Sequence, residues 1–347
     1  MKAKYMITVE MVGKGHPDKV ADQISDAVIY HCLKSDPSSR CAVETLLKDD
    51  TVVLAGELTT SAKLDGDDLS KIVDDVFKEV KYLYKPKIIN LLNRQSADIA
   101  QGVDTGGAGD QGMMFGYATS ETTNMMPYAY NIAKELMVNV DALNEHKEVL
   151  GDGKCQITLD DDNKICQLVV SKQNSNEKVL KELVNNMLKK AVVDFGKGST
   201  TFEEQMTKDC KVYINPTGKF EIGGPFGDCG LTGRKIIVDT YGGIAHHGGG
   251  AFSGKDLTKV DRSGAYYARE LAKKVINEGL AKEVEIRLAF IIGVAEVADV
   301  TCTYCDNGEY DKINEFLRKK KFTVKDMINT FSVEDVNPKR CIYGHFK

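Results

Sequence analysis

The sequence predicts an α/β protein of the α+β type, with three similar units in a pseudo-threefold arrangement. The first observation is the order helix, hairpin, helix, which occurs three times, beginning near residues 17, 127 and 260. The second is that glycine-rich links, at residues 101–116 and 218–233, join the units and are expected to be loops. Each unit should be a mostly antiparallel sheet with helices on one face. We place the units at residues 1–100, 101–219 and 220–347, with strands that can be exchanged between them.

The first unit begins with a strand at Tyr5–Val9 and a helix that starts at Pro17. Pro17 suits the first helical turn, where a backbone N–H would have no intrahelical partner. The strands Cys41–Leu47 and Thr51–Thr59 should form a hairpin, and an amphipathic helix follows at Asp67–Leu83.

The other two units repeat this order. In the middle unit, helices at Pro127–Leu150 and Glu177–Phe195 flank a hairpin of Cys155–Leu159 and Ile165–Val170. An aliphatic run at Lys235–Asp239 is expected to be a strand. In the third unit we expect helices at Val260–Glu278, Asp311–Lys319 and Val324–Phe331, and strands at Val284–Ile292 and Ala295–Tyr304.

The composition argues against two classes of partner. The 347 residues carry a formal net charge of −5, and lysines are mixed with acids throughout, so no basic stripe could follow a nucleic-acid backbone. There is no run of about 18 apolar residues, which argues against a membrane span and for a cytoplasmic protein. The nine cysteines are expected to be reduced thiols packed in the core. Cys302 and Cys305 form a lone CxxC, for which packing is favoured over a redox or metal role.

The most distinctive region is Phe220–Arg262, in which eleven of the 31 glycines lie between Gly223 and Gly254. Such a backbone lets a ligand approach closely, and fixed cations beside it suit a polyphosphate, whereas a solvated linker is the alternative. Within it, Gly249–Asp256 resembles a P-loop. However, Asp256 stands where Ser or Thr should hold Mg²⁺, and no strand precedes the motif, so its lysine and glycines should grip phosphate by another geometry.

Several carboxylates are candidates for binding cations. Asp18 and Asp261 stand at helix starts, and Mg²⁺ bound with a nucleotide takes one or two carboxylates plus phosphate oxygens. Helix capping is the ordinary alternative for each, but His16 and Lys19 flank Asp18, and lysines flank Asp261 as well. Glu44 and Glu57 lie in apolar strands, where each is either partly exposed on a sheet face or paired with a cation or a ligand amine.

Long uninterrupted strings of residues then point to a family. They are Gly15–Lys19 with Ala21–Ala27, Gly106–Tyr117, Gly223–Lys235 and Gly248–Asp256. Together they resemble S-adenosylmethionine synthetase (methionine adenosyltransferase), and the likeness extends from about residue 6 to residue 346. The resemblance implies three similar α/β units and a homodimer, or a homotetramer, with active sites between subunits. It also implies ATP and L-methionine as substrates, and Mg²⁺ (two per site) and K⁺ as cofactors.

The reaction that the resemblance implies is attack of the methionine sulfur on C5′ of ATP, which releases triphosphate. The enzyme then cleaves the triphosphate to pyrophosphate and phosphate. A thioether is already nucleophilic, so neither a general base nor a covalent intermediate is needed. The site should therefore be cationic and rich in glycine, and should lack a catalytic triad.

The resemblance also implies roles for matching residues. The catalytic residues would be His16, Lys164, Arg234, Lys235 and Lys255. ATP would be bound by these five residues together with Lys219, Phe220, Asp228 and Ala251, with Phe220 stacked on the adenine. Methionine would be bound by Glu57, Gln101, Asp110, Asp228 and Lys259. Asp18 and Asp261 would hold Mg²⁺, and Glu44 would hold K⁺.

Three departures from the family pattern carry expectations of their own. Only Thr105 and Gly106 join Gln101–Asp104 to Gly107–Asp110, which predicts a shortened lid with weaker exclusion of water. Lys14 stands where an acid is common, and Asn163 stands where a glycine often precedes the lysine. The chain also stops soon after Tyr343–His345, which is expected to alter C-terminal contacts. The short lid keeps open a second reading, that of a catalytically impaired nucleotide-binding homologue, and a P-loop-like kinase is a third.

Overall fold

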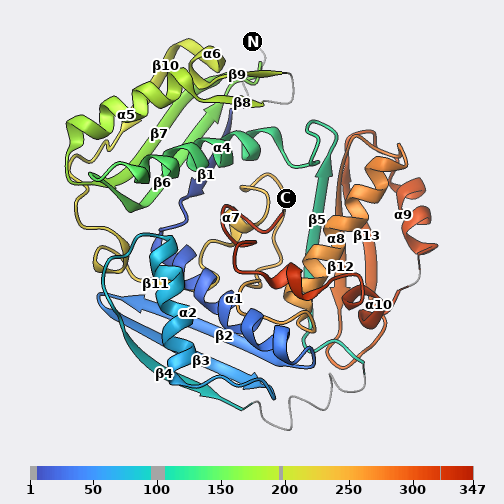
Figure 1. The fold of residues 1–347 in the computed structure, drawn as a ribbon. Helices are drawn as coiled ribbons and strands as arrows, with labels where there is room; N and C mark the ends of the chain where they lie inside the picture. Colours follow the sequence, from blue (N-terminus) through green and yellow to red (C-terminus); the bar gives the residue numbers. More distant parts are fainter. Residues whose placement is uncertain (1–5, 95–105, 195–197, 321, 347) are drawn as a thin grey trace.

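The computed structural model describes residues 6–94, 106–194, 198–320 and 322–346. Three larger sheets lie around a common centre, and helices pack on one face of each (Figure 1). The C-terminus and the short helix α7 (Ile236–Asp239) lie at that centre (Figure 1). The predicted α/β class with a pseudo-threefold arrangement of three units is therefore confirmed.

The first sheet has the strand order β11-β2-β3-β4, and α1 and α2 cover it. The hairpin β2–β3 is antiparallel, and β4 adds to it in parallel. The bounds are α1 Pro17–Ser35, β2 Arg40–Lys48, β3 Thr51–Thr59, α2 Gly66–Glu79, β4 Lys87–Asn93 and β11 Gly230–Leu231.

The middle sheet has the order β1-β6-β7-β10, with α4 and α5 on one face (Figure 1). The bounds are β1 Ile7–Val12, α4 Tyr128–Ala142, β6 Val149–Leu159, β7 Ile165–Asn174, α5 Glu177–Lys190 and β10 Met206–Ile214. Smaller elements are η1 Leu143–Glu145, β8 Val192–Asp194, β9 Ser199–Thr201 and α6 Phe202–Gln205.

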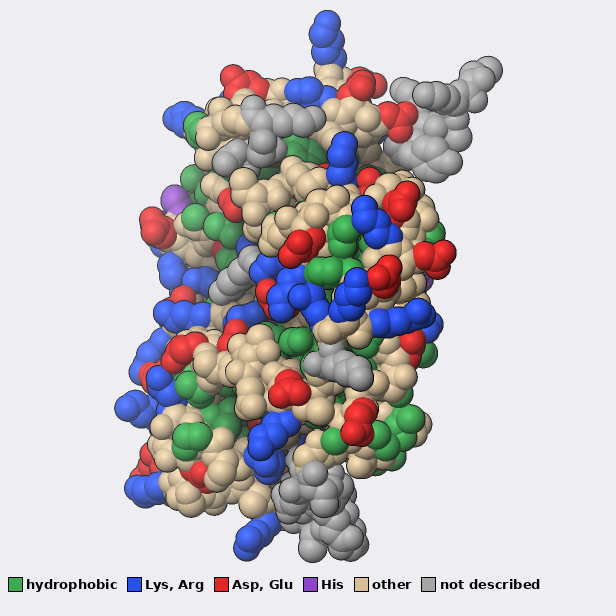
Figure 2. All heavy atoms as spheres, turned by 90° about the vertical axis from the view of Figure 1, so that its right-hand side faces the viewer, with side chains coloured by type: hydrophobic (Ala, Val, Ile, Leu, Met, Phe, Trp, Pro, Cys, Tyr) green, Lys and Arg blue, Asp and Glu red, His purple; other side chains and the backbone are tan. Residues whose placement is uncertain are grey.

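The third sheet has the order β13-β12-β5, covered by α8, with α9 beside β13. The bounds are β5 Gly112–Thr119, α8 Val260–Asn277, β12 Glu283–Phe290, β13 Asp299–Cys305, α9 Tyr310–Arg318 and α10 Val324–Ile328. The turns η2 Gly224–Phe226 and η3 Val333–Val336 complete the elements. On the side that carries α9 and α10, Lys and Arg side chains gather across the middle of the surface among Asp and Glu (Figure 2).

Each sheet takes one strand from another third of the chain. β1 joins the middle sheet, β5 joins the third sheet, and β11 joins the first sheet. The exchange is cyclic, as a threefold arrangement requires. A division of the chain at residues 100 and 219, which stays a prediction, therefore cuts across all three sheets.

Three sequence-based expectations about elements were wrong. Residues 235–239 form helix α7 rather than a strand, since the Asp239 N–H bonds to the Lys235 carbonyl at 2.9 Å. The helix expected to reach Leu150 ends at Ala142, because Val149–Gly153 extends β6 along β7. The link at residues 101–116 ends in strand β5, where Gly116 allows the backbone to touch α8; a Cβ there would lie 1.9 Å from the Ala268 carbonyl carbon.

The apolar core is divided into two clusters. The larger one joins the middle and third sheets with α4 and α8, and the smaller one lies between α1, α2 and the first sheet. The first turns of α1 bury polar side chains instead, among them Asp18, Lys19, Asp22 and Asp26. Among the described residues, none of the helices combines the length and apolar character needed to cross a bilayer.

Candidate active site

The loop Gly13–His16 presses against strand β6 and so fixes the start of α1. The Gly13 N–H donates to the Gly153 carbonyl at 2.8 Å, and the Tyr82 hydroxyl donates to the Gly15 carbonyl at 2.7 Å. A Cβ at Gly15 would lie 2.5 Å from the Gly151 oxygen, so this close approach needs glycine.

His16 is the N-cap of α1, and its Nδ1 accepts a hydrogen bond from the Asp18 N–H at 3.2 Å. Burial, together with the charges of Lys235 and Lys154, lowers the pKa of His16 to about 4, against the opposing effects of Asp18 and Asp228. The ring is therefore neutral near pH 7. Because Nδ1 accepts, Nε2 carries the hydrogen and can donate to an anionic ligand.

Asp18 joins this helix start to the glycine-rich region. Its Oδ1 accepts the Leu231 N–H at 2.9 Å, and its Oδ2 pairs with the Lys235 ammonium. The Asp18 side chain is almost fully buried, whereas 24% of the Lys235 side chain is exposed. We call His16, Asp18, Lys154 and Lys235 the His16 group; Arg234, whose side chain is exposed, lies next to it in the chain.

Lys154 is the residue of this group that sequence reasoning missed. It lies in the middle of β6 next to Gly153, whose carbonyl accepts the Gly13 N–H. Because the Cys155 thiol faces α4, donating to the Ala133 carbonyl, Lys154 points to the helix-free face of the sheet. The position of the β6–β7 turn and this alternation could have located it from the sequence.

Lys164, which the resemblance implied, lies in the turn between β6 and β7 of the same hairpin. Its N–H closes the turn by donating to Asp160 at 2.9 Å, and its ammonium donates to the Gln205 side chain at 3.3 Å. β6 runs five residues from Lys154 to Leu159 before this turn, which is about 17 Å at 3.3–3.4 Å per residue. Within one copy, Lys164 therefore does not reach the His16 group, and its role in a site shared between two copies stays a prediction.

A second set of predicted residues gathers around Lys255. The loop before it is fixed to β2, because the Val43 N–H donates to the Gly254 carbonyl at 2.8 Å. Gly254 has a φ of 81°, and a Cβ there would lie 1.9 Å from the Val43 oxygen. Lys255 forms an ion pair with Asp261 at the start of α8, and Lys259 lies 3.7 Å from Asp256.

Two glutamates on the helix-free face of the first sheet complete this Lys255 group, which we define as Lys255, Lys259, Asp261, Glu44 and Glu57. Partial burial raises the pKa of Glu44; Lys255 lowers it, and Asp22 and Glu57 raise it. Lys255 forms a β-bridge with Ala42, which is itself paired with Glu57. Neighbouring carboxylates of this kind attract a cation.

The predicted nucleoside residues lie within the glycine-rich region or just before it. Asp228 is exposed and close enough to His16 to raise its pKa. Phe220 and Lys219 line a pocket of about 590 Å³ beside the start of α5, and the Phe220 carbonyl accepts from the Asn174 N–H at 2.8 Å. Ala251 touches the backbone at Gly233, where a Cβ would lie 2.3 Å from the Ala251 Cβ.

The remaining methionine-site predictions fall near the proposed lid. Asp110 is exposed, and its carboxylate accepts the N–H of Gln111 at 2.8 Å. Gln101 and the lid residues up to Thr105 lie outside the described residues. The P-loop reading finds no support, because residues 243–253 before Lys255 are turns and irregular backbone rather than a strand.

The carboxylates suit Mg²⁺ bound together with phosphate. Among the residues that the structure describes, no three His, Cys, Asp or Glu side chains form a metal cage. Mg²⁺ needs only one or two carboxylates when phosphate oxygens and water supply the other ligands. Asp18 and Asp261 are each paired with a lysine that a bound phosphate could draw away, so their donor chemistry fits.

Comparison with known proteins covers nearly the whole chain. Family models of S-adenosylmethionine synthetase match its N-terminal domain at residues 4–104, its central domain at 105–220 and its C-terminal domain at 222–347. A solved structure described as an unusual S-adenosylmethionine synthetase from Campylobacter jejuni is 32% identical, with a TM-score of 0.86 over 98% of this chain and 94% of that one. The chain belongs to the S-adenosylmethionine synthetase family.

Proposed function

We propose that the His16 group of one copy and the Lys255 group of a second copy form the two walls of one adenosyl-transfer site. The family makes S-adenosylmethionine from ATP and methionine. The observation that carries the proposal is that each group holds a buried or half-buried lysine–aspartate pair beside a glycine-rich loop. In such a pair the lysine can exchange its carboxylate partner for a phosphate oxygen of the ligand.

The chemistry requires positioning rather than a base. The methionine sulfur attacks C5′ of ATP and the triphosphate leaves with the bonding electrons. Alignment of the reacting atoms can lower such a barrier by about 7–11 kcal/mol. Each preorganised contact to the leaving charge contributes about 3–4 kcal/mol. The neutral His16 donates from Nε2 to the triphosphate near the leaving oxygen, and Lys154, Arg234 and Lys235 hold the same anion.

The other wall completes the site. In this proposal Lys255 binds the polyphosphate, Lys259 and Glu57 lie at the methionine, and Asp110 faces its amine. On the first wall Phe220 stacks on the adenine and Asp228 faces the nucleoside. The roles of Gln101, Lys219 and Ala251 stay predictions of the same kind.

Cations would neutralise the charge that accumulates on the released triphosphate. Members of the family typically use Mg²⁺ and K⁺. Asp18 and Asp261 would hold Mg²⁺, and the Glu44 carboxylate, next to Glu57, would hold K⁺. The lysines paired with the two aspartates are then free to contact phosphate.

A homodimer explains why the site residues lie on uncovered faces. Lys154, Glu44 and Glu57 all lie on sheet faces that carry no helix. These two faces each expose a large apolar side chain, Leu91 at 54% and Tyr213 at 40%, and the third sheet exposes Met113 at 52%. A second copy would bury these surfaces and bring its Lys255 group to the His16 group. The family is typically cytoplasmic, and we place this chain there as well.

One assay tests the function. The protein is incubated with ATP, methionine, Mg²⁺ and K⁺, and S-adenosylmethionine, pyrophosphate and phosphate are measured together. All three products are expected. ADP as the only nucleotide product would instead support a kinase, and nucleotide binding without turnover would support an impaired homologue. Sedimentation of the same sample measures whether the protein is at least a dimer.

A further inference from the structure

Three aspartates on α1 form a ladder, of which the proposed mechanism uses only the first residue, Asp18. Asp18, Asp22 and Asp26 are spaced four residues apart and so lie on one side of the helix. Each accepts a backbone N–H from the glycine-rich region: Asp18 from Leu231 at 2.9 Å, Asp22 from Gly233 at 2.8 Å and Asp26 from Gly254 at 2.9 Å. The ladder spans about 12 Å of helix axis.

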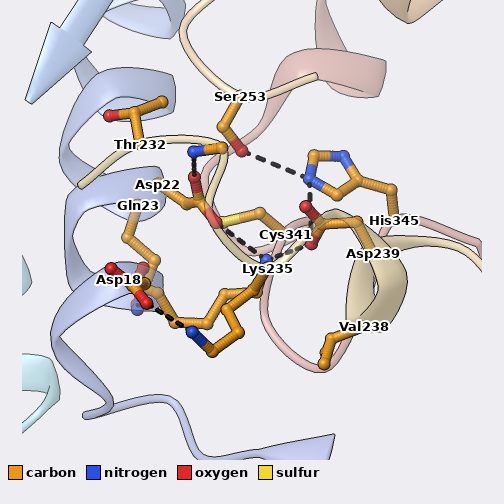
Figure 3. Close-up of polar contacts among 12 residues, drawn as sticks. Asp18, Asp22, Gln23, Thr232, Lys235, Val238, Asp239, Ser253, Cys341 and His345 are labelled. Atoms are coloured by element: carbon orange, nitrogen blue, oxygen red, sulfur yellow. Dashed lines mark hydrogen bonds and ion pairs between the residues drawn. The ribbon is translucent and has the colours of Figure 1, made fainter. Parts of the chain in front are cut away.

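Asp22, the middle residue, is connected to the ends of one short segment. Its Oδ1 accepts from Gly233, and its Oδ2 pairs with Lys19 at 3.0 Å. The Lys19 ammonium also contacts Asp239, at the end of α7. Figure 3 shows Asp22 on the side of the cluster near Thr232, with Asp239 and His345 on the opposite side. Between the two anchored ends lie Arg234 and Lys235.

The far anchor is itself held by the C-terminal segment. The His345 N–H donates to the Asp239 carbonyl at 2.9 Å. The Tyr130 hydroxyl lies 2.9 Å from the Val238 carbonyl and 3.0 Å from that of Tyr343, so it ties both segments to α4. Gly233, at the start of the segment, has a φ of 73°. As a glycine it has no side chain whose packing could orient the segment.

The buried ion triad of Asp22, Lys19 and Asp239 is expected to contribute little to the stability of the fold. All three side chains are at most 1% exposed, with two carboxylates to one ammonium. Burial raises the pKa of Asp22 despite Lys19, and raises that of Asp239 to about 7. Buried ion pairs are often no more stabilising than apolar residues of similar size. What the triad does provide is a fixed geometry for the segment.

We propose that Asp22 is a positioning residue, which accepts the Gly233 N–H and, through Lys19 and Asp239, holds residues 233–239 so that Arg234 and Lys235 face the triphosphate. This inference rests on the proposed function. It assigns to Asp22 no contact with substrate.

The test compares Asp22→Leu with Asp22→Asn in the full-length protein. Both variants remove the charge and leave Lys19 balanced by Asp239, but only asparagine keeps an acceptor for the Gly233 N–H. We expect Asp22→Leu to raise the KM for tripolyphosphate hydrolysis at least fivefold and to lower kcat at least tenfold. Asp22→Asn should stay within about threefold of the wild type. The KM for methionine at saturating ATP should change less than twofold in both, because Lys259 and Glu57 belong to the other wall.

A matched control separates positioning from loss of stability. Val73→Ala opens a cavity in the core of the first unit, away from the segment, and should lower the melting temperature with unchanged KM values. If Asp22→Leu does not fold, Asp22→Ala takes its place. Equal behaviour of the leucine and asparagine variants, or an equal rise in the KM for methionine, would overturn the inference. A wild-type protein that forms no S-adenosylmethionine would instead overturn the proposed function.

Discussion

The β6–β7 hairpin carries one lysine in the middle of a strand and one in its turn, and their surroundings differ. In the middle of β6, Lys154 stands beside the Gly13–His16 loop, close enough to affect the pKa of His16. In the turn, Lys164 lies at the surface and contacts the segment at Gln205. Both follow a small or polar residue and both are followed by an apolar strand position. Strand register, rather than local sequence, therefore decides which of the two lysines lies near His16 within one copy.

Removing each lysine separately tests directly whether the two differ in function. Lys154→Ala should lower kcat about 100- to 1000-fold, the loss typical of one preorganised contact to developing charge. Lys164→Ala should change kcat by less than about threefold, because its contacts are made at a surface turn. Steady-state kinetics of S-adenosylmethionine formation measure both. A large loss in Lys164→Ala with a small one in Lys154→Ala would reverse the assignment.

The stability of the region around Lys154 and His16 should also depend on pH, through the titration of His16. Its pKa is about 4 in the folded protein, below the value of 6.5 for a free histidine, so its contribution to stability is present above pH 6.5 and is lost as pH falls through about 4. Relative to His16→Asn, the wild type should lose about 3 kcal/mol of unfolding free energy between pH 7 and pH 4. Urea denaturation at several pH values measures the difference. If the unfolding free energies of the wild type and His16→Asn changed in parallel with pH, the pKa of His16 would not be lowered in the folded protein.

We expect a smaller effect from Lys235, the member of the His16 group that lies in the glycine-rich region and not on the β6–β7 hairpin. Lys235→Ala should lower turnover more than tenfold, because the triphosphate loses one fixed cation, while the protein stays folded. Asp18 would still accept the Leu231 N–H after this change. Circular dichroism provides the folding control. Unchanged kinetics would remove Lys235 from the site and leave Lys154 as the remaining lysine that acts on His16.

Much of the fold was predictable because it depends on local periodicity. The hairpin of β2 and β3 and the start of α1 at Pro17 lie where apolar alternation and a helix-start proline put them. α7 was missed because its four residues form too short a pattern to distinguish a turn of helix from a strand. The long helix expected before β6 was wrong because pairing with β7 outweighs helical periodicity there.

The candidate site was predictable in its residue types and less so in its pairings. Asp18 and Lys235 are 217 residues apart, yet they form an ion pair. Lys19 was expected to accompany Asp18, but it turns inward to Asp22 and Asp239. Helix geometry explains this change, because successive residues point about 100° apart, so neighbours in sequence do not share a face.

The family, the glycine-rich loops and the supply of cations could be predicted without a structure, because they depend on residue identity and on short-range spacing. Which cations lie close together depends on the tertiary structure. The exchange of β1, β5 and β11 between sheets, the register that selects Lys154, and the aspartate ladder of α1 all depend on contacts between residues far apart in the chain. Such contacts are set by how whole sheets and helices pack, and no local pattern encodes that packing.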